Sequence, residues 1–541
     1  GADNTAVGTN ALLSNTTASY NTAVGKSALA ANTTGDLNVA MGYEALGVNV
    51  AGDKSVAVGV QALYAQNPSG NADMFNTAVG YNAGTAVTTG INNTLIGGLA
   101  GDAITTASQN TAVGYNALTA TTTGAANTAV GFEALDANTT AANNTGIGWR
   151  ALYANTTGSG NVAVGVSALY SNTTASNNTA VGYQSQEATT TGASNSSLGL
   201  HALRLNTTAT ANVAVGTYAG YSLTTGGSNV AIGYNSLSTE DAHGGNVAVG
   251  TNSLANQDAG ATGYNTAVGH NAGISVSTGT NNTILGGLTG DSLTTGGANT
   301  ALGMQALNTE AAGGNSVAVG YQALYGANGT GARYNTAVGS NAGQNVTNGT
   351  QNTLLGGLTG NTQTSGSQNT LLGYATQASS NGGVRQIVIG SNTTGAGDNT
   401  VKIGTVSASA TLSLDGSDTS WAAASDERLK KDIVNSTVGL SFINALRPVT
   451  FKWNAKNAVE STLPQYDADS TDPVYGEGKA HHGFIAQEIK AVIDANADVV
   501  NGHNLWHTDP DGTQQVAPSA LVPMLVKAIQ ELTARIEELE G

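Results

Sequence analysis

The first four hundred residues of the chain repeat one short pattern of apolar and polar positions. The unit is NTAVG, as at 21–25, followed by small or apolar residues at Ala28 and Leu29 and then by the turn-forming sequence AANTTGD. Its glycine recurs from Gly8 to Gly404, and 19 of the 23 intervals are 17 residues long; the others are 21, 19, 19 and 14. A disordered chain has no reason to keep such a register, so the pattern predicts a solenoid.

Each repeat predicts one coil of the solenoid, with two short strands and two turns. Seventeen residues are too few for two packed helices, and the short apolar run bounded by turn residues is typical of a strand. We expect the repeated glycine to adopt a positive φ or to lie where the next backbone leaves no room for a Cβ atom. Stacked coils place Asn and Thr in hydrogen-bonded ladders and Val, Ile and Leu in an apolar stripe. The predicted fold of residues 1–404 is therefore a mainly β, parallel β-solenoid (β-roll).

Aromatic residues follow the repeated glycine in many coils. A coil this short has a thin core, and lateral association of several chains would supply the missing burial, so we expect a homotrimeric rod. The rings then pack in the core or between subunits; the alternative is a ladder on which sugars stack. The positions are Tyr43, Tyr81, Tyr115, Phe132, Trp149, Tyr183, Tyr234, Tyr321 and Tyr374.

The three longest intervals insert extra residues near 68–75, 257–264 and 325–334. We expect these loops to bulge from the rod and to be the best candidates for contact with a host glycan or receptor, although decoration or clasping between subunits would also explain them. Asp102 and Asp291 follow two of the loops by one coil, but Asn361 occupies the third equivalent position. Turn capping therefore explains these residues better than a metal site.

Acidic residues in the repeats give no signal of a glycan hydrolase. Such enzymes use two carboxylates about 5–10 Å apart, and the one local cluster is Glu240-Asp241 near His243, in the sequence STEDAHGG. Adjacent residues in a turn rarely converge on one bond, and we interpret this stretch as a solvated loop.

Charge changes abruptly at the sequence SDERLKKDI, 425–433. Residues 1–424 hold 7 Lys and Arg and 17 Asp and Glu, whereas the much shorter 425–541 holds 10 and 17. Six of the seven prolines also follow Ser425. We predict a fibre at 1–404, a connector at 405–424 and a separate domain at 425–541.

Several classes of function are disfavoured by composition. Both parts are acidic, with a net charge of −17 overall, which argues against a nucleic-acid partner. No apolar run approaches the ~18 residues of a membrane span and no secretory signal is visible, so we predict no membrane insertion. We predict no cofactor and no metal.

The chain begins at Gly1 inside a repeat, and we expect it to be a processed product or a fragment of a longer protein.

The C-terminal part predicts an α+β domain. The sequence at 438–448 predicts a short helix ended by Pro448, 449–454 a strand, and 480–493 a strand turning into a helix. The final stretch has a heptad pattern, which predicts an oligomerising coiled-coil helix. Its apolar positions are Leu525, Ile529, Leu532, Ile536 and Leu539. The histidines at 481, 482, 503 and 507 fit no familiar set of metal ligands, and we interpret them as structural.

Four ordered motifs carry a resemblance to a known family. They are SDERLKKDI (425–433), LRPVTFKW (446–453), GFIAQEI (483–489) and PSALVPMLVKAIQEL (518–532). Together they resemble the C-terminal intramolecular chaperone domain of endosialidase-type phage tailspikes and tail fibres. The NTAVG unit resembles the coil of trimeric autotransporter adhesin heads, which are left-handed parallel β-rolls with shorter coils.

The first resemblance implies a domain that trimerises the chains, guides folding of the fibre and then cuts itself off. It implies a cut between Ala424 and Ser425, with Ser425 as nucleophile and Lys430 as general base. Such a pair makes chemical sense, because a serine hydroxyl needs a base and a lysine serves only when its pKa is depressed; Lys431 and Arg428 can supply the positive field. From the residues alone, the same stretch reads as an N-cap serine and a charged first helical turn.

Together these features predict a trimeric virion fibre, phage tail fibre-like and used for host attachment, matured by Ser-Lys self-cleavage. The alternatives are a cell-surface adhesin or structural filament of a cellular organism, and a glycan-depolymerising tailspike. The expected location is the virion or an extracellular surface. The one predicted enzymatic activity is that of a self-cleaving serine endopeptidase, with no evident external substrate.

Overall fold

The computed structural model describes residues 1–414, 422–423, 427, 430–475, 478–496, 498–499, 505–509 and 512–541. The chain divides into two compact units, Gly1–Ala424 and Ser425–Gly541. Each unit is described by itself below.

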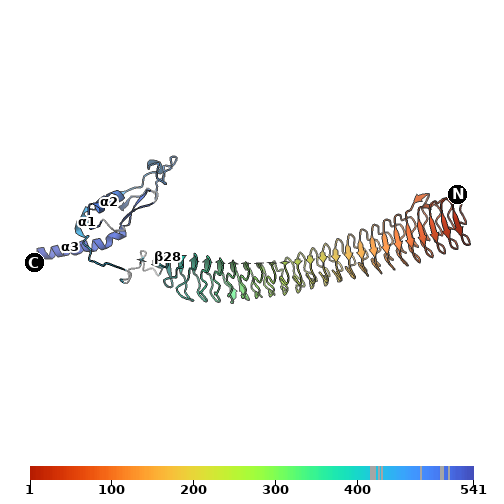
Figure 1. Ribbon diagram of the computed structural model, residues 1–541, viewed down its shortest axis with the longest axis horizontal. Coiled ribbons are helices and arrows are strands. Elements are labelled where there is room, and N and C mark those ends of the chain that lie inside the picture. The colour runs from red at the N-terminus through yellow and green to blue at the C-terminus, as the bar shows by residue number, and fades with distance from the viewer. Residues whose placement is uncertain are drawn as a thin grey trace. The chain divides into compact units, whose positions relative to one another are not determined.

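The first unit is a parallel β-solenoid of about 24 turns with coils of about 17 residues, as predicted (Figure 1). One short strand from each coil joins a 26-stranded main sheet. Pairing places like residues over like: Thr22 lies beside Thr5, and Ala23 beside Ala6 and Ala40. The stacking therefore keeps the register that the repeat predicts.

The main sheet is built almost wholly from three-residue strands. They are β1 (Thr5–Val7), β2 (Thr22–Val24), β3 (Val39–Met41), β5 (Val56–Val58), β7 (Thr77–Val79), β8 (Thr94–Ile96), β9 (Thr111–Val113), β10 (Thr128–Val130), β11 (Thr145–Ile147), β12 (Val162–Val164), β13 (Thr179–Val181), β14 (Ser196–Leu198), β15 (Val213–Val215), β16 (Val230–Ile232), β17 (Val247–Val249), β18 (Thr266–Val268), β19 (Thr283–Leu285), β20 (Thr300–Leu302), β22 (Val317–Val319), β24 (Thr336–Val338), β25 (Thr353–Leu355) and β26 (Thr370–Leu372). It ends with β27 (Ile387–Ser391), β28 (Thr400–Thr405), β29 (Ser409–Ser413) and β30 (Ala422–Ala423).

Each regular coil contributes one strand to the main sheet, and the prediction of two strands per coil was wrong. After the glycine of the repeat, the second and fourth residues have left-handed backbone, as at Ser27 (φ 58°) and Leu29 (φ 50°). Two such residues so close together prevent an extended strand. The rest of the coil is therefore made of turns.

The repeated glycine meets both conditions that the sequence predicted for it. Gly25 has φ +132°, and a Cβ atom placed there would lie 2.5 Å from the carbonyl oxygen of Gly42 in the next coil. Stacked coils thus approach each other too closely at this corner for any side chain.

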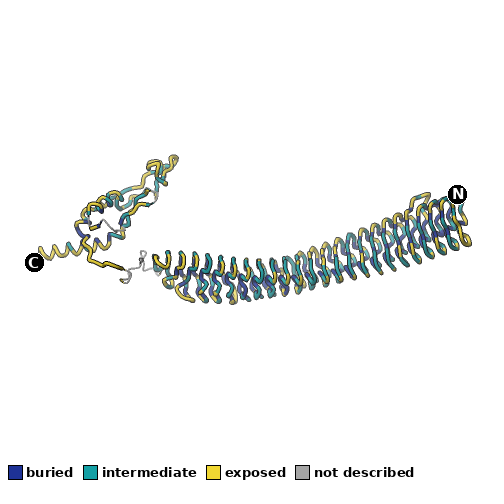
Figure 2. The backbone as a smooth tube through the Cα atoms, in the orientation of Figure 1, coloured by how far each residue is buried: buried dark blue, intermediate teal, exposed yellow. Residues whose placement is uncertain are grey.

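A narrow core runs inside the coils, as the dark-blue positions of Figure 2 show. Ala23, Ala28 and Leu29 are fully buried in it, whereas Val24 is partly exposed. Beside the apolar residues runs a buried ladder of asparagines: the Asn38 N–H donates to Asn21 Oδ1 at 2.9 Å, and Asn38 Nδ2 donates to the Gly52 oxygen at 2.8 Å. The ladder satisfies backbone groups that an apolar side chain would leave unpaired.

Two of the inserted segments add strand pairs to the rod and do not simply bulge from it. β6 (Ala72–Asp73) pairs in parallel with β4 (Gly52–Asp53), and Lys54 Nζ lies 2.7 Å from Asp73 Oδ2. In the same way β23 (Thr330–Ala332) pairs with β21 (Ala312–Gly314). These insertions are anchored to the preceding coil.

The second unit is a small α+β region. It contains α1 (Leu440–Ala445), β31 (Val449–Phe451), η2 (Lys456–Ala458), β32 (His481–Gly483), α2 (Ala486–Asp494), β33 (Trp506–Thr508), β34 (Gln514–Val516), η3 (Pro518–Leu521) and α3 (Val522–Glu540). β31 pairs with β32 and β33 with β34, both antiparallel. The predicted helices and strands at 438–454 and 480–493 are therefore present, and α3 includes the predicted helix with the heptad positions 525–539. Among the residues that the structure describes, no helix is long and apolar enough to cross a membrane.

Helix α3 carries two apolar faces. Met524 and Ala528 are buried in the core of the second unit, together with Phe442 and Ile489. The heptad positions lie outside that core: Ile529 is 61% exposed and Ile536 is 52% exposed. Within the described part of the chain, only the face with Met524 and Ala528 is covered.

Candidate functional site

The predicted cleavage site directly follows the strand that ends the rod. β28 is followed by β29, which pairs with it in the antiparallel sense, and β30 pairs in turn with β29, placing Ala422 beside Thr411 and Ala423 beside Ala410. Ala424 and Ser425 themselves lie outside the described residues. The boundary between the two compact units nevertheless falls between these two residues.

Lys430 is described, and its side chain is exposed. Its backbone N–H donates to the carbonyl oxygen of Glu427 at 3.0 Å. Residues 430–438 contain no helix, and α1 begins only at Leu440. The charged helical turn that the sequence alone indicates therefore does not continue into residues 430–438. Because Ser425 lies outside the described residues, no distance within the predicted dyad of Ser425 and Lys430 follows from the structure, and Arg428 is outside them too.

Two of the motifs that carry the family resemblance are joined by an ion pair. Arg447 of LRPVTFKW donates from Nε to Glu488 Oε2 of GFIAQEI at 2.9 Å, and its Nη2 also contacts Oε1. The guanidinium lowers the pKa of the Glu488 carboxyl through these hydrogen bonds. This planar, two-point contact holds the two motifs together in the folded unit.

An open apolar groove of about 670 Å³ lies on the second unit. Phe451, Trp453, Tyr475 and Phe484 line it, and its lining includes no carboxylate and no histidine among the described residues. His481 packs near Phe451 and Trp453, and His507 Nε2 lies 3.4 Å from Asp509 Oδ1. The groove offers an apolar surface and no acid–base pair.

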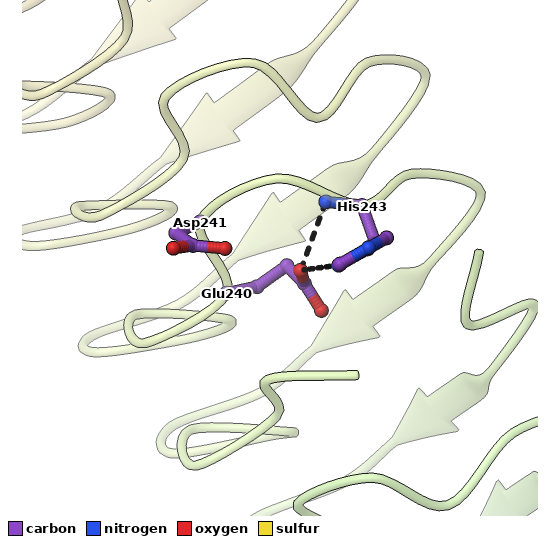
Figure 3. A group of neighbouring side chains, drawn as sticks. All are labelled: Glu240, Asp241 and His243. Atoms are coloured by element: carbon purple, nitrogen blue, oxygen red, sulfur yellow. Dashed lines mark hydrogen bonds and ion pairs between the residues drawn. The ribbon is translucent and has the colours of Figure 1, made fainter. Parts of the chain in front are cut away.

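The acidic cluster of the rod differs from its prediction. Glu240 is fully buried, accepting hydrogen bonds from the His243 N–H at 3.0 Å and from the Ala259 N–H at 3.4 Å, with His243 Nδ1 at 3.3 Å (Figure 3). Burial raises the pKa of its carboxyl above the usual range. Asp241 is exposed. The interpretation as a solvated loop was therefore right for Asp241 and wrong for Glu240.

Glu240 occupies a position that is buried in most coils, the seventh residue after the repeated glycine. Asn138 and Gln257 hold the same position and are buried too. A second glutamate, Glu310, occupies the same position in another coil and was not singled out from the sequence. Its carboxylate accepts a hydrogen bond from the Gly313 N–H at 2.8 Å. Burial raises the pKa of this carboxyl, and the charge of the buried Arg333 opposes that rise. Aligning the coils on their repeated glycine would have shown that both glutamates occupy this inward position. A fully buried carboxylate cannot reach a polysaccharide, so Glu240 and Asp241 do not form a hydrolase pair.

The aromatic residues after the glycine are exposed, so they do not pack in the core of the single chain, and their packing between subunits stays a prediction. Tyr43 is 40% exposed and Tyr81 is 60% exposed, and the others lie between these values. Tyr115 and Phe132 stack with ring centroids 5.7 Å apart. The rings therefore form part of the surface of the single chain.

Comparison with known proteins gives one match. Residues 425–498 match the model of a peptidase family described as chaperone of endosialidase. No curated protein and no solved structure matches the chain, so the resemblance of the repeats to adhesin heads stays a prediction. The match starts at the first residue of the second unit and includes three of the structural features above: the segment with Lys430, the β31–β32 pair and helix α2. The C-terminal unit of this chain thus carries a chaperone of endosialidase domain at residues 425–498.

Proposed function

We propose that the chain is one subunit of a homotrimeric virion fibre used for host attachment, and that its C-terminal domain trimerises and folds the fibre before cutting itself off. The observation that carries the proposal is a coincidence of boundaries. The family match starts at residue 425, and the compact rod ends at residue 424. A self-cleaving domain that begins where the rod ends would be released without damage to the rod.

The proposed cut lies between Ala424 and Ser425. The Ser425 hydroxyl attacks the carbonyl carbon of Ala424 while the neutral amine of Lys430 takes its proton. The C–N bond then breaks, the proton passes to the departing amine of Ser425, and the acyl group of Ala424 is left as an ester on Oγ. Water hydrolyses the ester, which restores the hydroxyl and leaves a carboxylate on Ala424.

The exposure of Lys430 suggests when the reaction takes place. A lysine acts as a base once burial or neighbouring positive charge lowers its pKa, and Lys430 is exposed in the single chain. We propose that association of the chains covers this segment. Cleavage then follows assembly, so a chain is not cut before it is folded.

The exposed heptad face of α3 supports association through the C-terminal domain. A stripe of apolar residues at spacings of three and four is the seam of a coiled coil, and this one has no partner within the described part of its own chain.

Expression of the full chain and its Ser425→Ala variant tests the proposal. Intact mass measurement should find a fragment ending at Ala424 in the parent and the uncut chain in Ser425→Ala. Ser441→Ala, at an exposed position of α1, is the matched control and should be cut normally. Lys430→Gln should block the cut, while Lys431→Gln should slow it at most partly. A fragment that persists in Ser425→Ala would overturn the assignment of the nucleophile.

A further inference from the structure

The outward face of the main sheet carries no charge along the whole series of three-residue strands, and one of its two rows of outward residues is apolar throughout. In such a strand the middle residue points inward and its two neighbours point outward, and from β2 onward the middle residue is buried. The first outward residue is Thr or Val, with one Ser, and the third is always Val, Ile, Leu or Met. Half of these third residues are exposed, among them Met41 (43%), Leu198 (52%) and Leu355 (43%), and the other half are partly exposed.

Charged residues are excluded from this outward face. None of the outward positions in the three-residue strands of the main sheet, all within the described residues, holds Asp, Glu, Lys or Arg. Many charges of the rod lie in the turns instead, where Glu133 pairs with Arg150 and Glu187 with Arg204, both at 2.7 Å. Parallel sheets are normally covered on both faces, and a large exposed apolar patch marks an interaction surface.

Only a partner with the same period can cover this face throughout. The face repeats every 17 residues in register over some twenty coils, and a second copy of the chain, parallel and at the same level, matches that period at every coil. The absence of charge lets the face meet an identical face without repulsion. The exposed heptad positions of α3, such as Ile529 and Ile536, independently favour association of identical chains.

We propose that the rods of identical subunits pack side by side, in register, through the outward face of the main sheet. The exposed aromatic residues two positions beyond nine of the strands, such as Tyr115 and Phe132, border the face and cover the edges of the interface. This inference rests on the proposed trimer and deepens it, because it assigns the surface that the subunits share along the rod.

The absence of cysteine in the chain allows a direct test. Leu198→Cys places a thiol on the face, and Thr191→Cys places one at an exposed turn position nearby in the chain. In the full-length assembled protein, we expect a maleimide to modify Leu198→Cys at least about ten times more slowly than Thr191→Cys. Both should react at similar rates in denaturant. A bis-maleimide should link chains through position 198 and not through position 191.

A second pair, Ile147→Cys and Thr140→Cys, occupies the same two positions elsewhere in the rod and replaces the first pair if one variant fails to fold. The oligomeric mass of each sample is measured in parallel. A trimer in which the face thiols react as fast as the turn thiols would overturn the interface while leaving the proposed trimer intact. A monomeric sample would overturn both. Protection of the face thiols without links between chains would mean that another molecule covers the face, and would also overturn the inference.

Discussion

Among single residues, the rod depends on a few positions at which almost any substitution is unfavourable. The repeated glycine combines a positive φ with close approach of the next coil, so that a Cβ on Gly131 would lie 2.4 Å from the Gly148 oxygen. Because a side chain at this position would collide with the backbone of the next coil, one substitution disturbs the stacking of two coils.

We expect Gly131→Ala to destabilise the rod by roughly 1–3 kcal/mol or more, from backbone strain and the clash together. Gly260→Ala is the control, since a Cβ there meets nothing within 4 Å. Denaturant unfolding followed by circular dichroism measures both. Equal midpoints for the two variants would contradict the account.

The buried glutamates predict a dependence on pH. Burial raises the pKa of Glu240, and a carboxyl whose pKa is higher in the folded chain stabilises the fold at low pH; that contribution is lost as the pH rises through the folded pKa. Glu240→Gln keeps one acceptor oxygen for the His243 N–H, gives up only the long 3.4 Å hydrogen bond from the Ala259 N–H, and removes the charge. The variant should be more stable than the parent at about pH 7.5, and the difference should shrink at about pH 4.5.

Glu310→Gln provides the contrasting case. Arg333 is buried, with 3% of its surface exposed, and its charge opposes the effect of burial on Glu310. Removing the carboxylate leaves a buried cation without its counter-charge, which should cost on the order of 1–3 kcal/mol at neutral pH. Thermal unfolding of both variants checks the opposite signs. Stabilisation by Glu310→Gln would show that Arg333 does not depend on this carboxylate.

At the scale of the elements, α3 joins the folding of one chain to the association of several. Its Met524 and Ala528 face belongs to the core of the second unit, and its heptad face is exposed. A substitution on the heptad face can therefore block association while leaving the unit folded.

We expect the double variant Ile529→Asp, Ile536→Asp to remain helical, to stay monomeric and to lose self-cleavage, because charge on the seam of a coiled coil is strongly unfavourable. Ala534→Asp, exposed and outside the heptad positions, is the matched control. Light scattering and electrophoresis measure association and cleavage. Full cleavage in a monomeric double variant would show that the reaction does not need assembly.

The elements also show how far the sequence alone leads. A 17-residue register and the spacing of Leu525 to Leu539 report long-range order directly, so the solenoid and α3 were predictable. The number of strands per coil was not, because it depends on left-handed residues such as Ser27 and Leu29 that are not glycine. The burial of Glu240 was missed because its neighbours resemble a polar loop and only the comparison of coils reveals an inward position. Ser425 rests on family resemblance, and the described residues do not include it.

At the scale of the whole molecule, the repeats create the problem that the C-terminal domain would solve. Near-identical coils allow a slip of one repeat to recover almost the same contacts, and exposed β-structure invites aggregation during folding. A domain that first aligns the chains would fix the register. Its later removal, as we propose, would leave a rod that cannot readily refold but unfolds slowly, which is kinetic stability.

Deletion of 425–541 should therefore give insoluble or monomeric chains, although the rod sequence is unchanged. The same rod released from the full-length chain by cleavage should be soluble and trimeric. Sedimentation of the two preparations compares them. A soluble trimer from the deleted gene would show that the domain is dispensable.

Native mass spectrometry of the purified product of the full gene tests whether three chains assemble and the C-terminal domain then leaves. We expect a particle whose mass equals three copies of a fragment ending at Ala424. A single uncut chain of 53.6 kDa would show that neither assembly nor cleavage takes place.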